Sequence, residues 1–215
     1  MHSPGRNALL ATVLVAFPLA AQQRAAATQL PPLLAEAEEI ALARSAAPAW
    51  ISDSATVYVL RRGGHVKART GSNGFSCLVA RDNPESLYPI CYDREASRTI
   101  LPVELRQQRL REQGRTEEEI DREIGYELAR GTFRPPTGAA VSYMMSRDQV
   151  LFAGPTGRRV GQWHPHVMIY VPYASAAQLG LDPGQGGHVF VGDEGKPTAH
   201  LVIIVPEWSK GGPAR

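Results

Sequence analysis

Two short apolar runs decide the fold: Phe-Ser-Cys-Leu-Val-Ala at residues 75–80 and Ile-Cys-Tyr at residues 90–92. Between them, residues 82–86 read Asp-Asn-Pro-Glu-Ser, which are residue types that favour turns. Apolar runs on both sides of a turn predict a β-hairpin. Such a hairpin brings Cys77 and Cys91 together, so we expect them to form a disulfide.

These two cysteines are the only ones in the chain. They lack the Cys-x-x-Cys spacing that lowers a thiol pKa, and a zinc site built on cysteine needs more thiolates. A structural disulfide is therefore the favoured role. In the chain-entropy model, closing a loop of this size stabilises the fold by roughly 3 kcal/mol. A lasting disulfide requires an oxidising compartment.

The N-terminal segment has the features of a secretory signal. Arg6 precedes an uncharged apolar stretch at residues 8–21, which is too short to span a bilayer. Small residues permit cleavage after Ala21 or after Ala27, and the sequence does not choose between them. We therefore expect residues 1–27 to be a signal peptide, the mature protein to be periplasmic or secreted, and the mature chain to have no stable membrane span.

Length and composition favour one globular domain over residues 28–215. The chain has 215 residues, of which 43% are hydrophobic, so it can bury a core and is not a disordered or collagen-like chain. Losing Arg6 and Arg24 with the signal takes the formal net charge from +2 to zero. A neutral chain lacks the field of cations that nucleic acid demands, so we expect no nucleic-acid partner.

The remaining pattern predicts a single α+β domain with a mostly antiparallel sheet, an N-terminal helix and a charged helical hairpin. Thr116 and Glu119 form a capping box for the second helix of that hairpin, and Gly131 is its expected stop. We expect helices at 33–47 and, as the hairpin, 101–129, and further strands at 55–60, 65–69, 141–145, 166–171, 188–191 and 200–205.

Histidines supply the sharpest functional hypothesis. His164 and His166 are two apart, which in a strand places both imidazoles on one side, as in a metal site. If the turn after residue 191 is centred on Glu194, His188 faces His200. These four histidines would suit zinc, copper or iron, and an open coordination position could activate water for hydrolysis.

Simpler roles compete with that hypothesis. Histidines at strand ends are often hydrogen-bonded to backbone carbonyls, and no His-Glu-x-x-His motif supplies a general base. His65 follows a glycine turn and is expected to be an exposed strand residue. Four aromatic residues, Trp163, Tyr170, Tyr173 and Tyr143, suggest a contact surface or a ligand pocket around the histidine strand, although Tyr170 and Met168 are also expected to share a core face with His166.

No serine lies in a Gly-x-Ser-x-Gly elbow, and no pair of carboxylates stands out, so no catalytic residue is assigned.

The chain resembles a group of exported bacterial proteins without an assigned function. The resemblance lies in the segments at 163–170 (Trp-His-Pro-His-Val-Met-Ile-Tyr), 74–77 (Gly-Phe-Ser-Cys) and 89–93 (Pro-Ile-Cys-Tyr-Asp). The resemblance implies an envelope or secreted location. It carries no catalytic residue across.

Two functions remain open. The favoured hypothesis is an exported protein that binds a small molecule or an envelope protein without catalysis and requires no cofactor. The alternative is a metal-dependent hydrolase with a transition metal such as zinc at His164 and His166, supported by His188 and His200.

Overall fold

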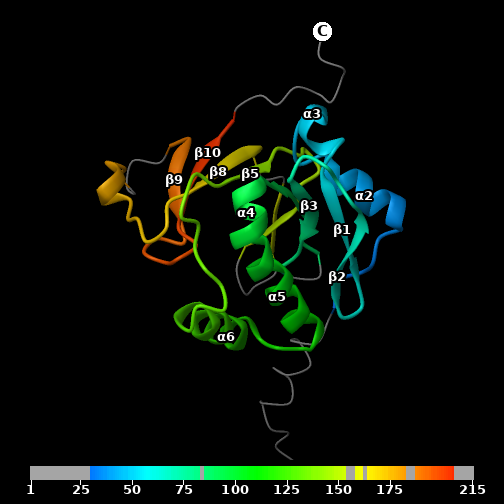
Figure 1. Ribbon diagram of the computed structural model, residues 1–215, viewed down its shortest axis with the longest axis horizontal. Helices are drawn as coiled ribbons and strands as arrows, with labels where there is room; N and C mark the ends of the chain where they lie inside the picture. The colour runs from blue at the N-terminus through cyan, green and yellow to red at the C-terminus, as the bar shows by residue number, and fades with distance from the viewer. Residues whose placement is uncertain (1–29, 83–84, 154–157, 162–163, 183–186, 206–215) are drawn as a thin grey trace, which may run out of the picture.

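The computed structural model describes residues 30–82, 85–153, 158–161, 164–182 and 187–205. The predicted signal segment at residues 1–27 and Trp163 lie outside the described residues. Within them the fold is α+β, as the sequence predicts: one eight-stranded sheet with helices packed on it (Figure 1). None of the helices in these ranges is long and apolar enough to cross a membrane.

The sheet runs β2-β1-β3-β4-β5-β8-β10-β9. Among the described strand pairs, β1 and β3 are parallel and the others antiparallel. The apolar C-terminal strand lies between two neighbours, as its two-sided hydrophobicity indicates. The strands are β1 Thr56–Arg61, β2 Gly64–Arg69, β3 Ser76–Ala80, β4 Tyr88–Tyr92, β5 Val141–Met144, β8 His166–Tyr170, β9 Val189–Gly192 and β10 His200–Ile204, with a separate hairpin of β6 Leu151–Ala153 and β7 Arg158–Gly161.

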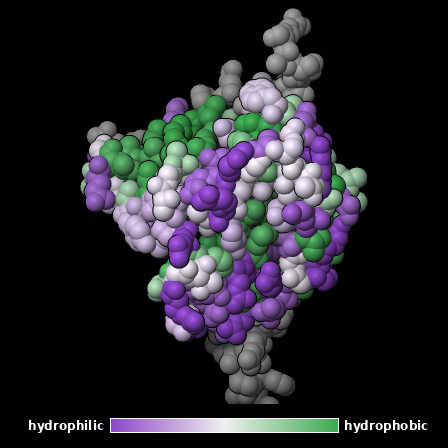
Figure 2. Space-filling model, viewed as in Figure 1, coloured by the Kyte–Doolittle hydropathy of each residue, from purple (hydrophilic) through white to green (hydrophobic). Residues whose placement is uncertain are grey.

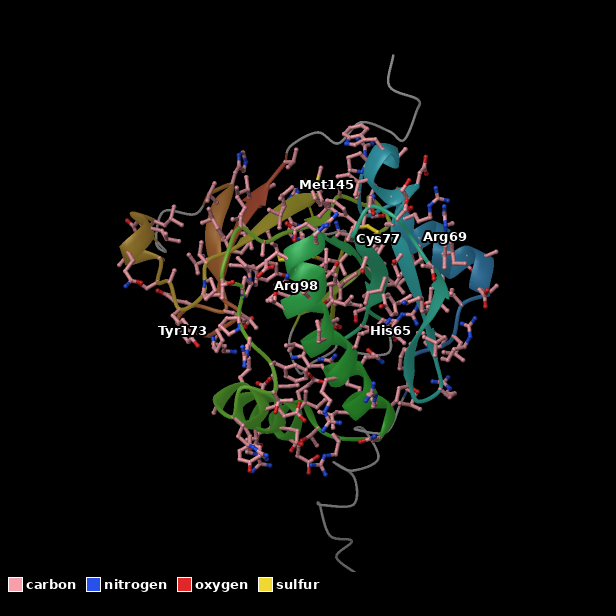
Figure 3. The ribbon with its side chains drawn as sticks, viewed as in Figure 1. His65, Arg69, Cys77, Arg98, Met145 and Tyr173 are labelled. Atoms are coloured by element: carbon pink, nitrogen blue, oxygen red, sulfur yellow. A yellow bond between two sulfur atoms is a disulfide. The ribbon has the colours of Figure 1, made fainter. Side chains whose placement is uncertain are left out.

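The disulfide between Cys77 and Cys91 is present, and the two residues are directly opposed on the antiparallel strands β3 and β4. Figure 3 shows its yellow sulfur bond beside the labelled Cys77. Both cysteines are fully buried. The hairpin predicted from the two apolar runs is thus confirmed.

Side chains alternate across this hairpin and build two cores. Cys77 and Val79 face α2 (Glu36–Arg44), and Leu78 and Ala80 face α4 (Arg94–Thr99) and α5 (Leu101–Glu112). Because helices cover both faces, every residue of β3 is buried. Figure 1 shows α4 and α5 crossing the middle of the sheet, with α6 (Glu117–Ala129) below them.

The helices show where sequence periodicity succeeds and fails. The Thr116–Glu119 capping box is formed, and Gly131 follows α6 with φ of 74°. The N-terminal helix is shorter than the predicted 33–47, because Ala35 is extended and Pro48 instead begins a separate short helix, α3 (Ala49–Ser52). α4 was not predicted. It has only six residues, too few for a hydrophobic stripe, and its start is fixed by Asp93, whose side chain accepts a hydrogen bond from the Ala96 amide at 2.8 Å.

Candidate functional site

A cavity of about 910 Å³ lies between the sheet and the α5–α6 hairpin. Cavities of this size hold small organic ligands. Its floor is formed by alternate residues of neighbouring strands, and its wall by α5, α6 and the loop before β10. Six floor residues carry the argument below: Tyr88, Tyr92, His166, Met168, Tyr170 and His200.

Strand register explains why these residues share one face. His166, Met168 and Tyr170 are successive inward positions of β8, as predicted from their spacing. In the neighbouring β10, His200 pairs with Tyr170 and Val202 pairs with Met168. Paired residues point to the same side of a sheet, so β10 continues the same floor.

His166 and His200 are both brought to this cavity, and both are held in the same way. The Nδ1 atom of His166 lies 2.8 Å from the carbonyl oxygen of His164, and that of His200 lies 3.0 Å from the carbonyl oxygen of Thr198. Because a carbonyl oxygen only accepts, Nδ1 carries the proton in each ring, and Nε2 is left as an acceptor in the neutral form. Burial lowers the pKa of His166, and nearby His200 adds to the effect, so this imidazole favours its neutral form.

The structure does not bring the other two histidines to the cavity. His164 is exposed, and His188 is exposed just before β9. The expected pairing of His188 with His200 is wrong: His200 lies opposite Gly192, and the His188 carbonyl accepts a hydrogen bond from the Ile204 amide at the far end of the pair. Asp193 and Gly195, with φ of 53° and 73°, help build a longer connection, at residues 193–199, whose centre is residue 196 and not 194.

No group of three or more His, Cys, Asp or Glu side chains within the described ranges is arranged to hold a metal ion. The two cysteines are bonded to each other, which removes them as ligands and as nucleophiles. His166 and His200 therefore give the cavity floor two imidazoles whose orientation is fixed through Nδ1.

Tyr92 and Tyr170 place two phenol groups in the same floor. Burial raises the pKa of both, so both are neutral phenols at neutral pH. The Tyr170 hydroxyl lies 3.2 Å from the Ser142 hydroxyl, with which it shares a hydrogen bond. Tyr92 is only 2% exposed.

Glu104 is a charged cavity residue that the sequence analysis did not single out. It lies on α5 between Ile100 and Gln107, which also line the cavity at helical spacing. Its carboxylate makes no hydrogen bond or ion pair with any described residue, and burial raises its pKa. The sequence could have indicated Glu104, because this acid shares a helical stripe with Ile100. The helical hairpin has many exposed acids, so one more acid did not stand out.

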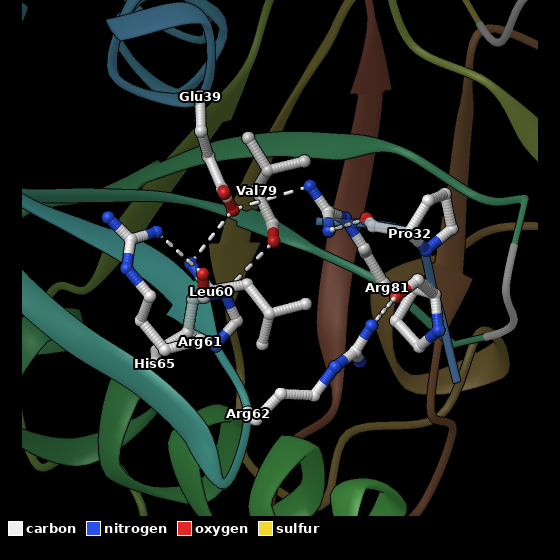
Figure 4. A network of polar contacts seen from close by, with 9 residues as sticks. Pro32, Glu39, Leu60, Arg61, Arg62, His65, Val79 and Arg81 are labelled. Carbon is white, nitrogen blue, oxygen red and sulfur yellow. Dashed lines mark hydrogen bonds and ion pairs between the residues drawn. The ribbon is translucent and has the colours of Figure 1, made fainter. Parts of the chain in front are cut away.

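A second polar cluster, which involves β1, β2 and β3, corrects the prediction for His65 (Figure 4). His65 is half-buried, not exposed, and its Nε2 lies 3.0 Å from the Val79 carbonyl oxygen. Burial lowers its pKa to about 4. Its neighbour Arg81 is fully buried and pairs with Glu39, and no residue of this cluster lines the cavity.

The aromatic residues predicted to form a pocket are divided. Tyr170 and Tyr173 line the cavity, and Figure 3 shows Tyr173 on the loop that follows β8. Tyr143 is on the opposite face, where its ring lies 6.3 Å from that of Phe75. Figure 2 shows apolar residues gathered over the β8–β10–β9 end of the molecule and charged residues over α5 and α6.

The fold and cavity thus define an α+β domain with a ligand-sized chamber over the middle and C-terminal strands of its sheet. No family model, curated protein or solved structure matches the chain.

Proposed function

We propose that this protein is exported to the periplasm or secreted, and that it binds a small ligand non-covalently in the cavity without catalysis. The observation that carries the proposal is the cavity itself: about 910 Å³, lined mainly by apolar and aromatic side chains, with a few polar groups converging from different elements. That combination is typical of small-molecule sites.

The polar groups support binding more than chemistry. His166 and His200 have fixed acceptor nitrogens, and Tyr170 has its hydroxyl engaged with Ser142. Within the described residues, the two hydroxyl groups of the lining that contact a carboxylate, those of Tyr88 and Thr198, do so at Asp82 and Asp193, which are exposed to solvent. The arrangement is suited to orient a ligand.

Export is supported by two independent features. Residues 1–27 have the composition of a signal peptide. The Cys77–Cys91 disulfide is of the structural kind that persists in oxidising compartments. The resemblance to exported bacterial proteins points to the same location.

A dye experiment tests the binding site. Nile red, a neutral dye whose fluorescence rises in apolar surroundings, should bind the purified protein saturably with one site per chain. Met168 faces the cavity, so Met168→Trp should place a larger ring in its floor, obstruct the ligand and weaken binding at least tenfold. Ile169 is the next residue of β8 and faces the other side of the sheet, so Ile169→Trp is the matched control and should bind normally. Equal binding by both variants would refute the cavity as the site.

Export is tested separately with an alkaline phosphatase reporter, which is active only after disulfide formation outside the cytosol. Fusion to residues 1–27 should give an active enzyme in a bacterial host, and the same reporter without them should not. An inactive fusion that is retained in the cytosol would refute export by this segment.

A further inference from the structure

The charges that line the cavity are mostly negative. Asp82, Glu104, Asp121 and Asp193 contribute carboxylates, and the one lysine or arginine that lines the cavity within the described residues is Lys196. The Lys196 ammonium is 3.3 Å from the Asp193 carboxylate, so it is already paired. The net charge of the cavity lining is therefore negative.

Among these carboxylates, Glu104 differs from all the others in position, and from Asp82 and Asp193 also in partners. Asp82, Asp121 and Asp193 are exposed at the rim. Asp82 accepts a hydrogen bond from Tyr88 at 3.0 Å, and Asp193 accepts one from Thr198 at 2.8 Å. Glu104 is set back among the cavity walls and has no partner within the described residues. Arg111, the cation that lowers the Glu104 pKa, is bound through two nitrogens to Glu117 at 2.8 and 2.9 Å.

Tyr92 supplies a second, independent observation. Its side chain lines the cavity and is 2% exposed, yet its hydroxyl has no hydrogen-bond partner in the part of the chain that the structure describes. Buried polar groups are normally hydrogen-bonded, so an unpartnered one calls for an explanation. Both Tyr92 and the nearby Glu104 carboxylate can accept a hydrogen bond from a donor placed between them.

Aromatic rings line the same cavity. Tyr88, Tyr92 and Tyr170 lie in the floor, and Tyr173 and Phe190 lie at the β9 side of the cavity. The faces of such rings attract organic cations, and their area favours an apolar body.

We propose that the cavity binds a small organic amine with an apolar or aromatic body, whose ammonium group is held by the Glu104 carboxylate and the Tyr92 hydroxyl. This rests on the proposed function and names the chemical class of its ligand. A negatively charged ligand is disfavoured, because it would meet Glu104 with no unpaired cation on the lining and with His166 in its neutral form.

The test compares three molecules with the same body: 4-phenylbutylamine, 4-phenylbutanol and 4-phenylbutyrate. Affinities are measured by calorimetry on the full oxidised protein, with saturation-transfer NMR for weak binders. The amine should bind at least tenfold more tightly than the alcohol, and the carboxylate least tightly. A charged hydrogen bond gives about 1.5–3 kcal/mol, which is a factor of ten or more.

Glu104→Gln should weaken the amine at least tenfold and leave the alcohol within twofold. Glu118→Gln removes the same charge from an exposed site of α6 that does not line the cavity, and should leave both affinities unchanged. Tyr92→Phe, which keeps the ring, is the second variant. It removes one hydrogen bond and should weaken binding of the amine by about threefold to tenfold. Thermal melting confirms that each variant is folded.

The amine proposal is overturned if the alcohol binds as tightly as the amine, or if neither Glu104→Gln nor Tyr92→Phe changes their ratio. It is also overturned if none of the three molecules binds or displaces Nile red. Nile red binding that Met168→Trp abolishes would still support the cavity as a ligand site in that case. Nile red binding that Met168→Trp leaves unchanged would refute the proposed function itself.

Discussion

Glu39 and Arg81 form an ion pair of 3.3 Å in which the two side chains are 0% and 1% exposed. The same Glu39 oxygen accepts a hydrogen bond from the Leu60 amide at 2.9 Å, and Arg81 donates to the Pro32 carbonyl at 3.2 Å. The pair therefore joins α2, β1 and the end of β3 around one charged centre (Figure 4). Charges this deeply buried are held by their partners, so each depends on the other.

Removing one partner should be costly. We expect Arg81→Met to lower the free energy of unfolding by about 3–5 kcal/mol, because it leaves the Glu39 carboxylate buried without its cation. Arg98→Ala is the control: Arg98 pairs with Glu95 but is 69% exposed, and its loss should cost less than about 1 kcal/mol. Urea denaturation measures both. Similar losses in the two variants would contradict the view that burial makes the Glu39–Arg81 pair important.

His65 should make the fold sensitive to acid. Its pKa is lowered to about 4 in the folded state, mainly by burial, against 6.5 for an ordinary histidine. The unfolded chain therefore takes up the proton first, so the contribution of His65 to stability is complete above pH 6.5 and is lost as the pH falls towards 4. The slope is about 1.4 kcal/mol per pH unit within that window.

His65→Gln keeps a donor for the Val79 carbonyl but does not titrate. The difference in unfolding free energy between the native chain and this variant should change across pH 6.5 to 4 and stay constant above pH 7. A difference that is flat over the whole range would contradict the assignment.

The disulfide should contribute by restricting the unfolded chain. Replacing both Cys77 and Cys91 by alanine should lower the free energy of unfolding by roughly 3 kcal/mol beyond any packing loss, as expected for a loop of about 15 residues. Reduction of the native protein, followed by urea denaturation, separates the two contributions. If reduced and oxidised native chains unfold at the same urea concentration, the disulfide has no stabilising role.

Two glycines of the cavity lining should respond differently to replacement by alanine. A Cβ at Gly192 would lie 2.4 Å from the His200 Nε2, so Gly192→Ala should displace that imidazole and shift its NMR resonances. A Cβ at Gly125, inside α6, would meet nothing within 4 Å, so Gly125→Ala should stabilise the protein by about 0.5–1 kcal/mol. Unshifted His200 resonances in Gly192→Ala would contradict this packing.

The metal hypothesis has a direct measurement. Because His164 and His188 are exposed and do not line the cavity, we expect protein purified without an affinity tag to contain far less than one transition metal per chain. Elemental analysis of the native chain and of His166→Ala tests this. A stoichiometric zinc, copper or iron that His166→Ala loses would favour the hydrolase alternative.

Sequence periodicity predicted the parts of the fold whose signals are local. The β3–β4 hairpin, its disulfide and the capping box of α6 depend on residues close in the chain, and all are present. The short α4 and the β6–β7 hairpin were missed, since three to six residues give too few repeats to reveal a period. The register predicted for β9 and β10 was wrong, because the register depends on backbone dihedral angles in the turn.

The candidate site is harder to predict, because a cavity is a relation between elements distant in the chain. The sequence by itself placed His166, Met168 and Tyr170 on one face, since strand alternation is a local property. Only the tertiary structure decided that Glu104 faces them, that Glu39 pairs with Arg81 and that His65 is half-buried. An acid on a helix carries the same local signal whether solvent or a sheet covers it, and its burial and neighbours in the tertiary structure set its charge and its partners.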